Sequence, residues 1–346
     1  MPLDDVLGPI GVEVVVGEVT GFDHYRHELY CAVAGRSVAL PYDRLVFALG
    51  SQLARPPIPG LAAHGFDIDT YDAAGRLAAH LAALPQRPDG PGRFTALVVG
   101  GGLTGVEAAA ELATRLPAIA GGAPCRVILI NRAPRVGSTM GEDACAVIEE
   151  ALRTLKIEMR PGVTVASIDE RGVRLSSGEA IEAATVVWCA GMRAHPPPAA
   201  LPGAHDGFGR VAADRFLRVE AEDGIFAAGD VAAAFVDGTH AAVMSCQHAR
   251  PMERIAGHNV VCDLVGAKMI PLDIGYYVTC LDLGAWGALY TEGRDRRVAV
   301  TGAAAKETER MISCERIYPP RSRDPAKILA AAAPVTQTPP RQSAAT

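Results

Sequence analysis

A run of glycines with a spacing suited to phosphate binding lies at residues 100–105. Gly100, Gly102 and Gly105 satisfy the pattern G-x-G-x-x-G, and Gly101 lies between the first two. In such a turn the first glycine permits a tight bend, the second lets backbone approach a pyrophosphate, and the third lets a helix pack closely on a strand. The free amides and positive dipole end of that helix can then bind phosphate groups. The spacing predicts a dinucleotide site, and its alternative is a tight turn in an α/β sheet that binds nothing.

This pattern has that meaning only between a strand and a helix, and the flanking residues have the required character. Residues 96–99 form a short apolar run of strand length, and the residues from Val106 onward are strong helix formers. Residues 125–130 have the composition of a second parallel strand. We therefore expect a Rossmann-like domain around the glycines.

The end of that second strand bears on the choice of nucleotide. A carboxylate at this place usually holds the ribose 2′-hydroxyl of NAD, but here the strand runs into Asn131, Arg132 and, after two residues, Arg135. A neutral Asn131 removes the repulsion that a 2′-phosphate would meet, and either arginine could pair with that phosphate. Alternatively, both arginines are solvated surface residues. The sequence leaves NADPH open beside NADH.

Similar strand ends lie on either side of the glycine unit. Residues 42–51 form a buried type of strand that ends in the small residues Gly50 and Ser51. A further short apolar strand, in residues 224–232, ends at Gly229 and Asp230. The Asp230 carboxylate could accept hydrogen bonds from a sugar or ribityl hydroxyl, or it could cap the following segment. These ends predict one nucleotide-binding domain inserted into another.

The ordered set ALGS, GGGLTGVE, WCAG, GIFAAGDVA and CQHA is more specific than any one member. It resembles the flavoproteins with two dinucleotide-binding domains, and most closely the type II NADH dehydrogenases, which pass electrons from NADH through FAD to a quinone. The resemblance covers nearly everything from residue 42 to residue 266. It implies an α/β fold in which a Rossmann-like NAD(P)H domain is inserted in an incomplete FAD domain, followed by a C-terminal β-rich module.

The same resemblance assigns cofactor contacts to two groups of residues. Those implied for NAD(P)H are Gly100, Gly101, Gly102, Thr104, Gly105, Asn131, Arg132, Ala190 and Gly191. Those implied for FAD are Gly50, Ser51, Gly229, Asp230 and Ala249. Glu107 matches a glutamate near the nicotinamide and flavin, and Gln247 matches a glutamine at the flavin and quinone pocket, so these two are the catalytic candidates. A carboxylate at Glu107 would also suit the helix dipole in any protein.

The expected domains follow from this alignment of motifs. Residues 1–93 and 196–266 are the two halves of the partial FAD domain, residues 94–195 the NAD(P)H domain, residues 267–325 the β-rich module and residues 326–346 a disordered tail. Within them we expect a strand at residues 12–16, a loop at 117–124 and a helix at 244–266.

One part of the family pattern is not found. Family members begin with their own strand, G-x-G-x-x-G turn and helix, which hold the ADP half of FAD, whereas here Met1 is followed by Pro2-Leu3-Asp4-Asp5. We expect either a late start of this sequence or loss of the main FAD anchor. In both cases the chain as written would bind FAD weakly.

Bulk composition narrows the class of protein. The 346 residues are enough for about two domains, and a net charge of −6 with scattered lysines and arginines argues against a nucleic-acid partner. Eight cysteines form no C-x-x-C pair or zinc pattern, which is typical of reduced thiols in a cytoplasmic protein without a metal site. No run reaches the length of a membrane span. Residues 326–333 make a poor membrane anchor, so we expect a cytoplasmic protein, with peripheral contact at the cytoplasmic face of the membrane left open.

The leading hypothesis is an FAD-dependent NAD(P)H dehydrogenase that reduces a quinone or another small acceptor. Its alternatives are a ferredoxin or rubredoxin reductase of the same superfamily and a truncated NAD(P)H-binding protein without flavin activity. Disulfide reductases of the superfamily carry a redox cysteine pair and a C-terminal His-Glu base, and neither is present. The oligomeric state stays open, with a dimer among the options.

Overall fold

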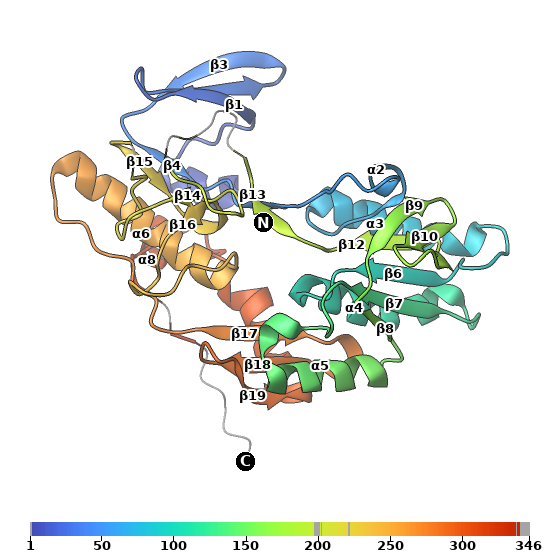
Figure 1. The fold of residues 1–346 in the computed structure, drawn as a ribbon. Helices are drawn as coiled ribbons and strands as arrows, with labels where there is room; N and C mark the ends of the chain where they lie inside the picture. Colours follow the sequence, from blue (N-terminus) through green and yellow to red (C-terminus); the bar gives the residue numbers. More distant parts are fainter. Residues whose placement is uncertain (1, 197–200, 202, 221, 337, 340–346) are drawn as a thin grey trace. The chain divides into compact units, whose positions relative to one another are not determined.

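The computed structural model describes residues 2–196, 201, 203–220, 222–336 and 338–339. By its contacts the chain groups into two compact units, which are taken separately (Figure 1). Unit 1 comprises the described parts of Met1–Gln52, Met192–Tyr276 and Cys314–Pro339, and unit 2 those of Leu53–Gly191 and Tyr277–Ser313. This grouping follows packing, so the division of the chain by cofactor remains a prediction.

A parallel sheet with strand order β12, β6, β7, β8 is the centre of unit 2 (Figure 1). Its strands are β6 (Thr95–Val99), β7 (Arg126–Asn131), β8 (Glu158–Pro161) and β12 (Thr185–Trp188). Helix α4 (Leu103–Ala120) connects β6 to β7, and α5 (Glu142–Thr154) connects β7 to β8. All residues of β6 are buried, as expected for a parallel strand covered on both faces. The expected Rossmann-like arrangement around the glycines is confirmed.

Two antiparallel sheets complete unit 2. The first has the order β11, β10, β9 and the second the order β17, β18, β19. Their strands are β9 (Val165–Asp169), β10 (Gly172–Leu175), β11 (Ala180–Glu182), β17 (Val278–Asp282), β18 (Ala288–Glu292) and β19 (Arg297–Thr301). The remaining α-helices of the unit are α2 (Leu61–His64), α3 (Tyr71–Ala83) and α7 (Gly302–Met311).

The loop expected at residues 117–124 begins only at Gly121, because α4 continues through Pro117 to Ala120, so the first half of that expectation is wrong. A proline inside a helix removes one backbone hydrogen bond and is costly in isolation. Here Leu116 and Ala120 are both buried against the sheet, so packing of the last turn outweighs that cost. The helix ends at Gly121, which has a left-handed φ of 59°.

Unit 1 combines an antiparallel sheet with short parallel pairs. Its strands are β1 (Glu18–Asp23), β2 (Glu28–Val33), β3 (Arg36–Pro41), β4 (Leu45–Phe47), β5 (Ser51–Leu53, whose last residue belongs to unit 2), β13 (Met192–Ala194), β14 (Val211–Ala212), β15 (Ile225–Ala227) and β16 (Ala232–Ala233). Strand β4 pairs in parallel with β15, although they are far apart in sequence. The long helix α6 (Cys246–Val265) confirms the helix expected at residues 244–266.

The strand expected at residues 12–16 is wrong, since β1 begins only at Glu18. Val12, Val15 and Val16 are exposed, and no strand pairs with them among the described residues. A β-branched run favours a strand only where it can pack on a pleated, half-buried surface.

The tail expected to be disordered from residue 326 begins instead with helix α8 (Pro325–Ala331). The Asp324 carboxylate accepts hydrogen bonds from the amides of Ala326 (2.9 Å) and Lys327 (3.3 Å), and Ile328 is buried. That part of the expectation is therefore wrong, and residues 340–346 lie outside the described residues.

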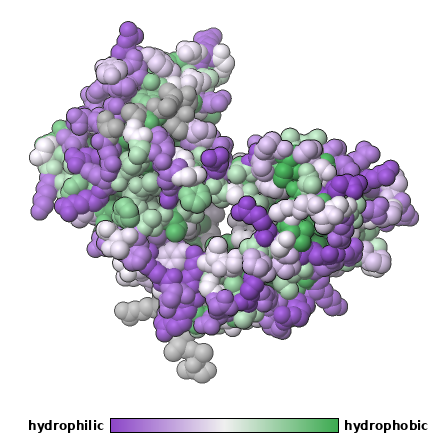
Figure 2. Space-filling model, viewed as in Figure 1, coloured by the Kyte–Doolittle hydropathy of each residue, from purple (hydrophilic) through white to green (hydrophobic). Residues whose placement is uncertain are grey.

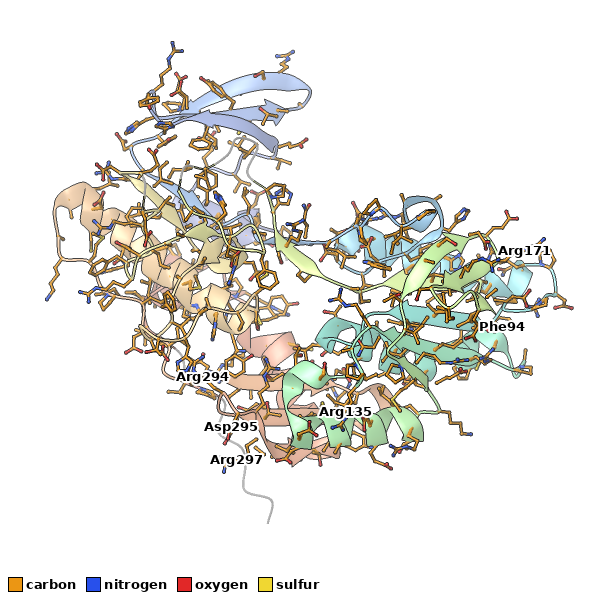
Figure 3. All side chains as sticks on the ribbon, viewed as in Figure 1. Phe94, Arg135, Arg171, Arg294, Asp295 and Arg297 are labelled. Carbon is orange, nitrogen blue, oxygen red and sulfur yellow. The ribbon has the colours of Figure 1, made fainter. Side chains whose placement is uncertain are left out.

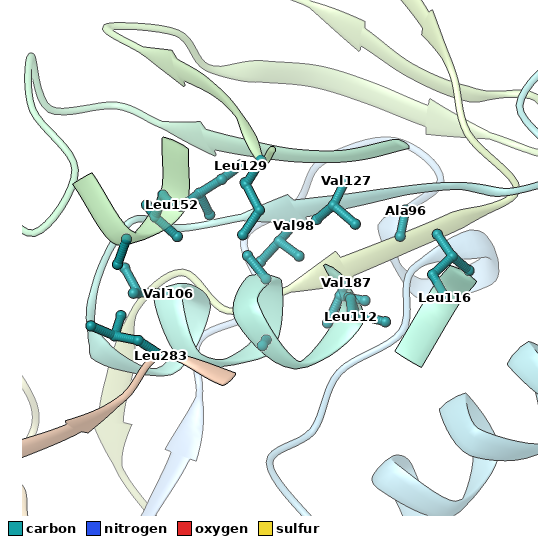
Figure 4. Packing of buried hydrophobic residues seen from close by; sticks show 14 of the residues in the cluster. Ala96, Val98, Val106, Leu112, Leu116, Val127, Leu129, Leu152, Val187 and Leu283 are labelled. Carbon is teal, nitrogen blue, oxygen red and sulfur yellow. The ribbon is translucent and has the colours of Figure 1, made fainter. Parts of the chain in front are cut away.

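The two units are built on separate apolar clusters, and among the described residues unit 2 has three of them and unit 1 has one. In unit 2, Val106 and Leu112 of α4 pack against Val98 and Leu129 of the parallel sheet, and Leu283, beside the C-terminal sheet, joins the same cluster (Figure 4). In unit 1, Phe47 of β4 belongs to a separate cluster around β15 and α6. On the face seen in Figure 2, hydrophilic residues are interspersed with smaller apolar areas. No helix in the described part of the chain is long and apolar enough to cross a membrane.

Candidate functional site

The three spaced glycines have three different environments at the end of β6. Gly100 has a φ of +122°, and a Cβ atom there would lie 2.9 Å from the carbonyl carbon of Cys189. A Cβ on Gly105 would lie 1.7 Å from the carbonyl oxygen of Gly100, so α4 packs too closely on the turn for any side chain. By contrast, a Cβ on Gly102 would meet nothing within 4 Å. The turn and the packing need Gly100 and Gly105, whereas Gly102 leaves open space at the surface.

That open space adjoins the first turn of α4. The helix starts after Gly102 without any side-chain cap, and Gly102, Leu103 and Thr104 are exposed. The first amides of a helix have no partner within it, so these are accessible to an anion. These residues therefore fit a pyrophosphate, although their contact with one remains a prediction.

The other NAD(P)H candidates lie at the same edge of the sheet, where the strands end. The amide of Gly100 donates to Ile130 (2.8 Å), and the amide of Cys189 donates to Val99 (2.8 Å). The Trp188 indole donates to the carbonyl oxygen of Ala190 (3.0 Å) and to that of Ala54 (3.1 Å). The ends of β6, β7 and β12 are thus brought together, as the sequence predicts for the carboxyl ends of parallel strands.

Asn131 ties the loop after β7 to the glycine turn. Its side-chain nitrogen donates to the carbonyl oxygens of Ala133 (3.1 Å) and Arg135 (2.7 Å), and its side-chain oxygen accepts from the amide of Gly101 (3.3 Å). A Cβ on Gly101 would lie 2.6 Å from the Asn131 side chain, so the two residues require each other. Asn131 therefore shapes the loop as well as ending the strand.

The two arginines of this loop have opposite environments. Arg135, labelled in Figure 3, lies near helix α5. It donates two hydrogen bonds to Glu149 of α5 (2.9 and 3.1 Å) and one to Glu142. The Arg135 guanidinium lowers the pKa of Glu149 in turn. Arg132 is exposed, and among the described residues no side chain or backbone group pairs with it. The interpretation as a solvated surface residue is therefore excluded for Arg135, which is an ion-pairing residue.

Glu107 lies on α4 and is linked to the C-terminal part of unit 2. Its carboxylate accepts a hydrogen bond from the backbone amide of Asp282 (3.0 Å). Burial raises the pKa of Glu107 to about 7, the Asp282 amide opposes this shift, and the charges of Asp282 and Glu309 add to it. Lys306 of α7, which is ion-paired with Asp282, lowers the pKa of Glu107.

Sequence reasoning missed this Asp282–Lys306 pair. Asp282, whose amide bonds to Glu107, lies 175 positions from it in sequence, and neither Asp282 nor Lys306 lies in a recognisable motif. Only the packing of the C-terminal sheet on α4 brings them to Glu107. Burial raises the pKa of Glu107 to about 7, and the charges of Asp282 and Lys306 adjust it in opposite directions.

The candidate FAD residues of unit 1 also come together. Strands β4 and β15 lie side by side, and beyond their ends the Ser51 hydroxyl donates to the Asp230 carboxylate (2.6 Å). Gly229 has a φ of +69°, and its Cβ position would be 3.5 Å from the Cβ of Ala249 and 3.3 Å from a carboxylate oxygen of Glu253. Gly50 likewise has a left-handed φ of 70°.

Asp230 does not act as a helix cap. It is the second residue of a short 3-10 turn, Gly229–Val231, whose cap position is Ala228. This arrangement fits the carboxylate acceptor for a sugar hydroxyl that the sequence suggested. Glu253 of α6, close to Gly229, is the acidic neighbour that the sequence gave no reason to select.

Gln247 is the second residue of α6 in unit 1, whereas Glu107 belongs to unit 2. The two catalytic candidates therefore lie in different units, and their joint role remains a prediction. Within the described residues, no three histidine, cysteine or acidic side chains come together to hold a metal ion.

Comparison with known proteins places this geometry in a family. The model of the pyridine nucleotide-disulphide oxidoreductases matches residues 8–252. The chain is 50% identical over 340 residues to an NADH dehydrogenase-like protein of Mycobacterium tuberculosis, covering 97% of this chain and 84% of the relative. It is 28% identical to a demethylphylloquinone reductase of Synechocystis, covering 90% of this chain and 76% of the relative.

A solved structure supports the fold. NDH2 from Plasmodium falciparum in complex with NADH superposes with a TM-score of 0.73 at 13% identity, covering 91% of this chain and 82% of that one. At this identity the similarity establishes the fold alone. The family model covers most of the chain, and the mycobacterial relative is 50% identical to it. The chain therefore belongs to the pyridine nucleotide-disulphide oxidoreductase family.

Proposed function

We propose that this chain is an FAD-dependent NAD(P)H dehydrogenase that passes electrons to a quinone-type acceptor. Family membership accounts for FAD and NAD(P)H as cofactors. The observation that carries the proposal is Glu107, a half-buried carboxyl two residues beyond the last glycine of the phosphate loop, which accepts a hydrogen bond from the Asp282 amide and has a pKa raised to about 7. The relative named as a demethylphylloquinone reductase supports the acceptor class.

The nucleotide would be held by unit 2. The accessible amides at the start of α4 would bind the pyrophosphate, with Gly102 leaving the space for it. Asn131 would keep the adjoining loop in place, since its side chain holds both the loop and the glycine turn. When FAD is bound, it supplies the two-electron chemistry between nicotinamide and acceptor.

In unit 1, Ser51 and Asp230 would hold a sugar or ribityl hydroxyl of FAD. Their mutual hydrogen bond of 2.6 Å orients the Asp230 carboxylate, which still has lone pairs for a further donor. Gln247, at the start of α6, would face the acceptor.

Proton supply is the part of the reaction that Glu107 would serve. Reduction of a quinone by NAD(P)H consumes one proton from the medium, because NAD(P)H, a quinone and H⁺ give NAD(P)⁺ and a hydroquinone. A general acid is most effective when its pKa lies near the working pH. Glu107 meets that condition because burial keeps a large fraction of it protonated at pH 7.

The test combines a spectrum with turnover. The purified chain is supplied with FAD, its flavin absorption band is recorded, and oxidation of NADH and NADPH is followed with a soluble quinone. We expect turnover, reduced at least ten-fold in Glu107→Gln with unchanged flavin content. Absence of turnover with the flavin site filled would refute the proposal. Faster reduction of an iron-sulfur protein would favour the ferredoxin-type reductase, and nucleotide binding without flavin would favour a binding protein.

A quinone acceptor also bears on location. We propose a cytoplasmic protein, for which peripheral contact with the cytoplasmic face of the membrane would give access to a quinone dissolved in the bilayer. Flotation with vesicles of neutral and anionic lipid measures that contact directly. A chain that stays unbound with both would be restricted to soluble acceptors.

A further inference from the structure

The residue that ends β7 holds the following loop in place here but does not bind the ribose. In a dinucleotide domain that prefers NAD, a carboxylate at this strand end binds the ribose hydroxyls. Here Asn131 uses both of its donor positions on the carbonyl oxygens of Ala133 and Arg135, and its oxygen accepts from Gly101. Its side chain is occupied in shaping the loop, so the position offers neither a negative charge nor a free donor to the ribose.

Arg135 is also occupied. Its guanidinium binds Glu149 through two hydrogen bonds and Glu142 through a third, so two carboxylates surround one cation. A phosphate would have to displace both glutamates to reach it. Arg135 therefore fixes α5 to the loop and contributes little positive charge to a ligand.

Arg132 is the cation that remains. It follows the last residue of β7, is exposed, and has no carboxylate partner among the described residues. Glu142 and Glu149 of the following helix α5 are held by Arg135. A planar guanidinium can bind a phosphate through two parallel hydrogen bonds.

We propose that the chain selects nucleotides that carry a 2′-phosphate, preferring NADPH to NADH, and that Arg132 is the residue that makes this selection. The inference deepens the proposed function and rests on it, since it requires the glycine turn at residues 100–105 to hold a pyridine nucleotide. Selection has two sources: an attractive charge at Arg132 and the lack of a repulsive one at Asn131. Reducing power would accordingly come from the NADPH pool.

Binding of two small probes tests the selection without any turnover. Adenosine 2′,5′-bisphosphate and adenosine 5′-monophosphate differ only in the 2′-phosphate, and isothermal titration gives the dissociation constant of each for the full chain. We expect the bisphosphate to bind at least ten-fold more tightly. The ratio should fall as sodium chloride is raised from 50 to 500 mM, because the Arg132 contact is exposed to solvent.

Two variants assign the effect to one side chain. Arg132→Ala should reduce the ratio to about two or less while leaving the affinity for adenosine monophosphate unchanged. Arg126→Ala is the matched control, since it removes an equal charge from an exposed, ion-paired arginine at the opposite end of β7. It should leave the ratio as in the wild type. Circular dichroism of both variants checks that they fold.

The proposal is overturned if the wild type binds both probes equally, if it binds neither, or if Arg132→Ala keeps the ratio. It is also overturned if Arg126→Ala lowers the ratio as much, because a general charge effect would then explain it. These outcomes are separate from those for the proposed function. Selective binding with no reduction of any quinone would leave this inference standing, and efficient turnover with NADH alone would do the reverse.

Discussion

Glu107 shows how a single residue can be placed by motif and tuned by distant packing. Its position after the glycine turn is readable from the sequence, and so are the glycines, Asn131 and Arg132. The pKa of Glu107 is not readable, because it depends on burial and on Asp282 and Lys306. The difference between Arg132 and Arg135 is equally hidden, because it is set by the glutamates that α5 presents to one of them.

The raised pKa of Glu107 predicts a pH dependence of stability. In the unfolded chain this carboxyl ionises near its ordinary pKa, whereas in the folded chain it stays protonated up to about pH 7. The contribution of Glu107 to the free energy of unfolding is therefore complete below about pH 4.5. It is lost as the pH rises through about 7, by up to about 3 kcal/mol. The free energy of unfolding in urea is measured from pH 4.5 to 8.5 for the wild type and for Glu107→Gln. The difference between the two proteins at each pH gives the contribution of the Glu107 carboxyl. A difference that does not change with pH would contradict a half-buried Glu107 that stays protonated up to about pH 7.

The Asp282–Lys306 pair predicts two opposite shifts of the pH profile of NAD(P)H oxidation. Lys306→Met removes a positive charge that lowers the pKa of Glu107, so the profile should move to higher pH. Asp282→Asn removes a negative charge that raises it, so the profile should move to lower pH, while the backbone hydrogen bond to Glu107 is kept. Lys306→Arg is the control and should stay near the wild type. Shifts in the same direction for both variants would point to a general loss of structure.

At the scale of elements, the strand-turn-helix around the glycines was predictable because local pattern and tertiary role agree there. The strand predicted at residues 12–16 is wrong, since the β-branched residues there favour a strand but no other described strand pairs with them. The loop predicted from Pro117 begins later for the opposite reason. Burial of Leu116 and Ala120 stabilises α4 beyond Pro117, a residue that usually ends a helix. Helix α8 depends on its Asp324 cap and on burial of Ile328, which composition alone does not reveal.

The glycine turn predicts a contrast between two alanine substitutions. Gly105→Ala places a methyl group against the Gly100 carbonyl oxygen, so it should destabilise the chain by about 3 kcal/mol or more. Gly102→Ala places its methyl in open space at a φ of −79°, so stability should change by less than about 1 kcal/mol. Its cost should be in nucleotide affinity, because the methyl occupies the approach of the phosphates. Thermal unfolding and titration with NADPH separate the two effects. Unchanged affinity in Gly102→Ala would exclude this turn as the phosphate site.

At the scale of the whole molecule, the large apolar clusters of the described residues fall into one unit or the other. Phe47 and Ile225 belong to the core of unit 1, while Val98, Leu129 and Leu283 belong to that of unit 2. The sequence predicted an inserted nucleotide domain because strand ends flank the glycine unit. It did not reveal that Tyr277–Ser313 packs with that domain, since an antiparallel module carries no mark of the surface it covers.

Because the two units have separate apolar clusters, we expect a nucleotide bound by unit 2 to stabilise that unit more than unit 1. A nucleotide that binds only the folded form at 100 times its dissociation constant adds about 2.7 kcal/mol of stability. Scanning calorimetry of the full chain should therefore show NADPH moving the part of the transition that belongs to unit 2, with the remainder little changed. Proteolysis during heating should show fragments of unit 2 becoming the more resistant. One sharp transition that shifts as a whole would mean that the units unfold together.

The hydrogen bond from the Ala54 amide to the Gly191 carbonyl oxygen, 3.0 Å long, joins the two points where the chain enters and leaves residues 53–191. A segment whose ends are this close can be exchanged as a cassette at two adjacent joints, while the host chain supplies the counterpart of Tyr277–Ser313 that packs with it. Grafting residues 53–191 of this chain into the mycobacterial relative, in place of its corresponding segment, would transfer the loop at Asn131 and Arg132 as one piece. The nucleotide preference of such a hybrid would then follow the cassette, while the identity of the electron acceptor would stay with the host.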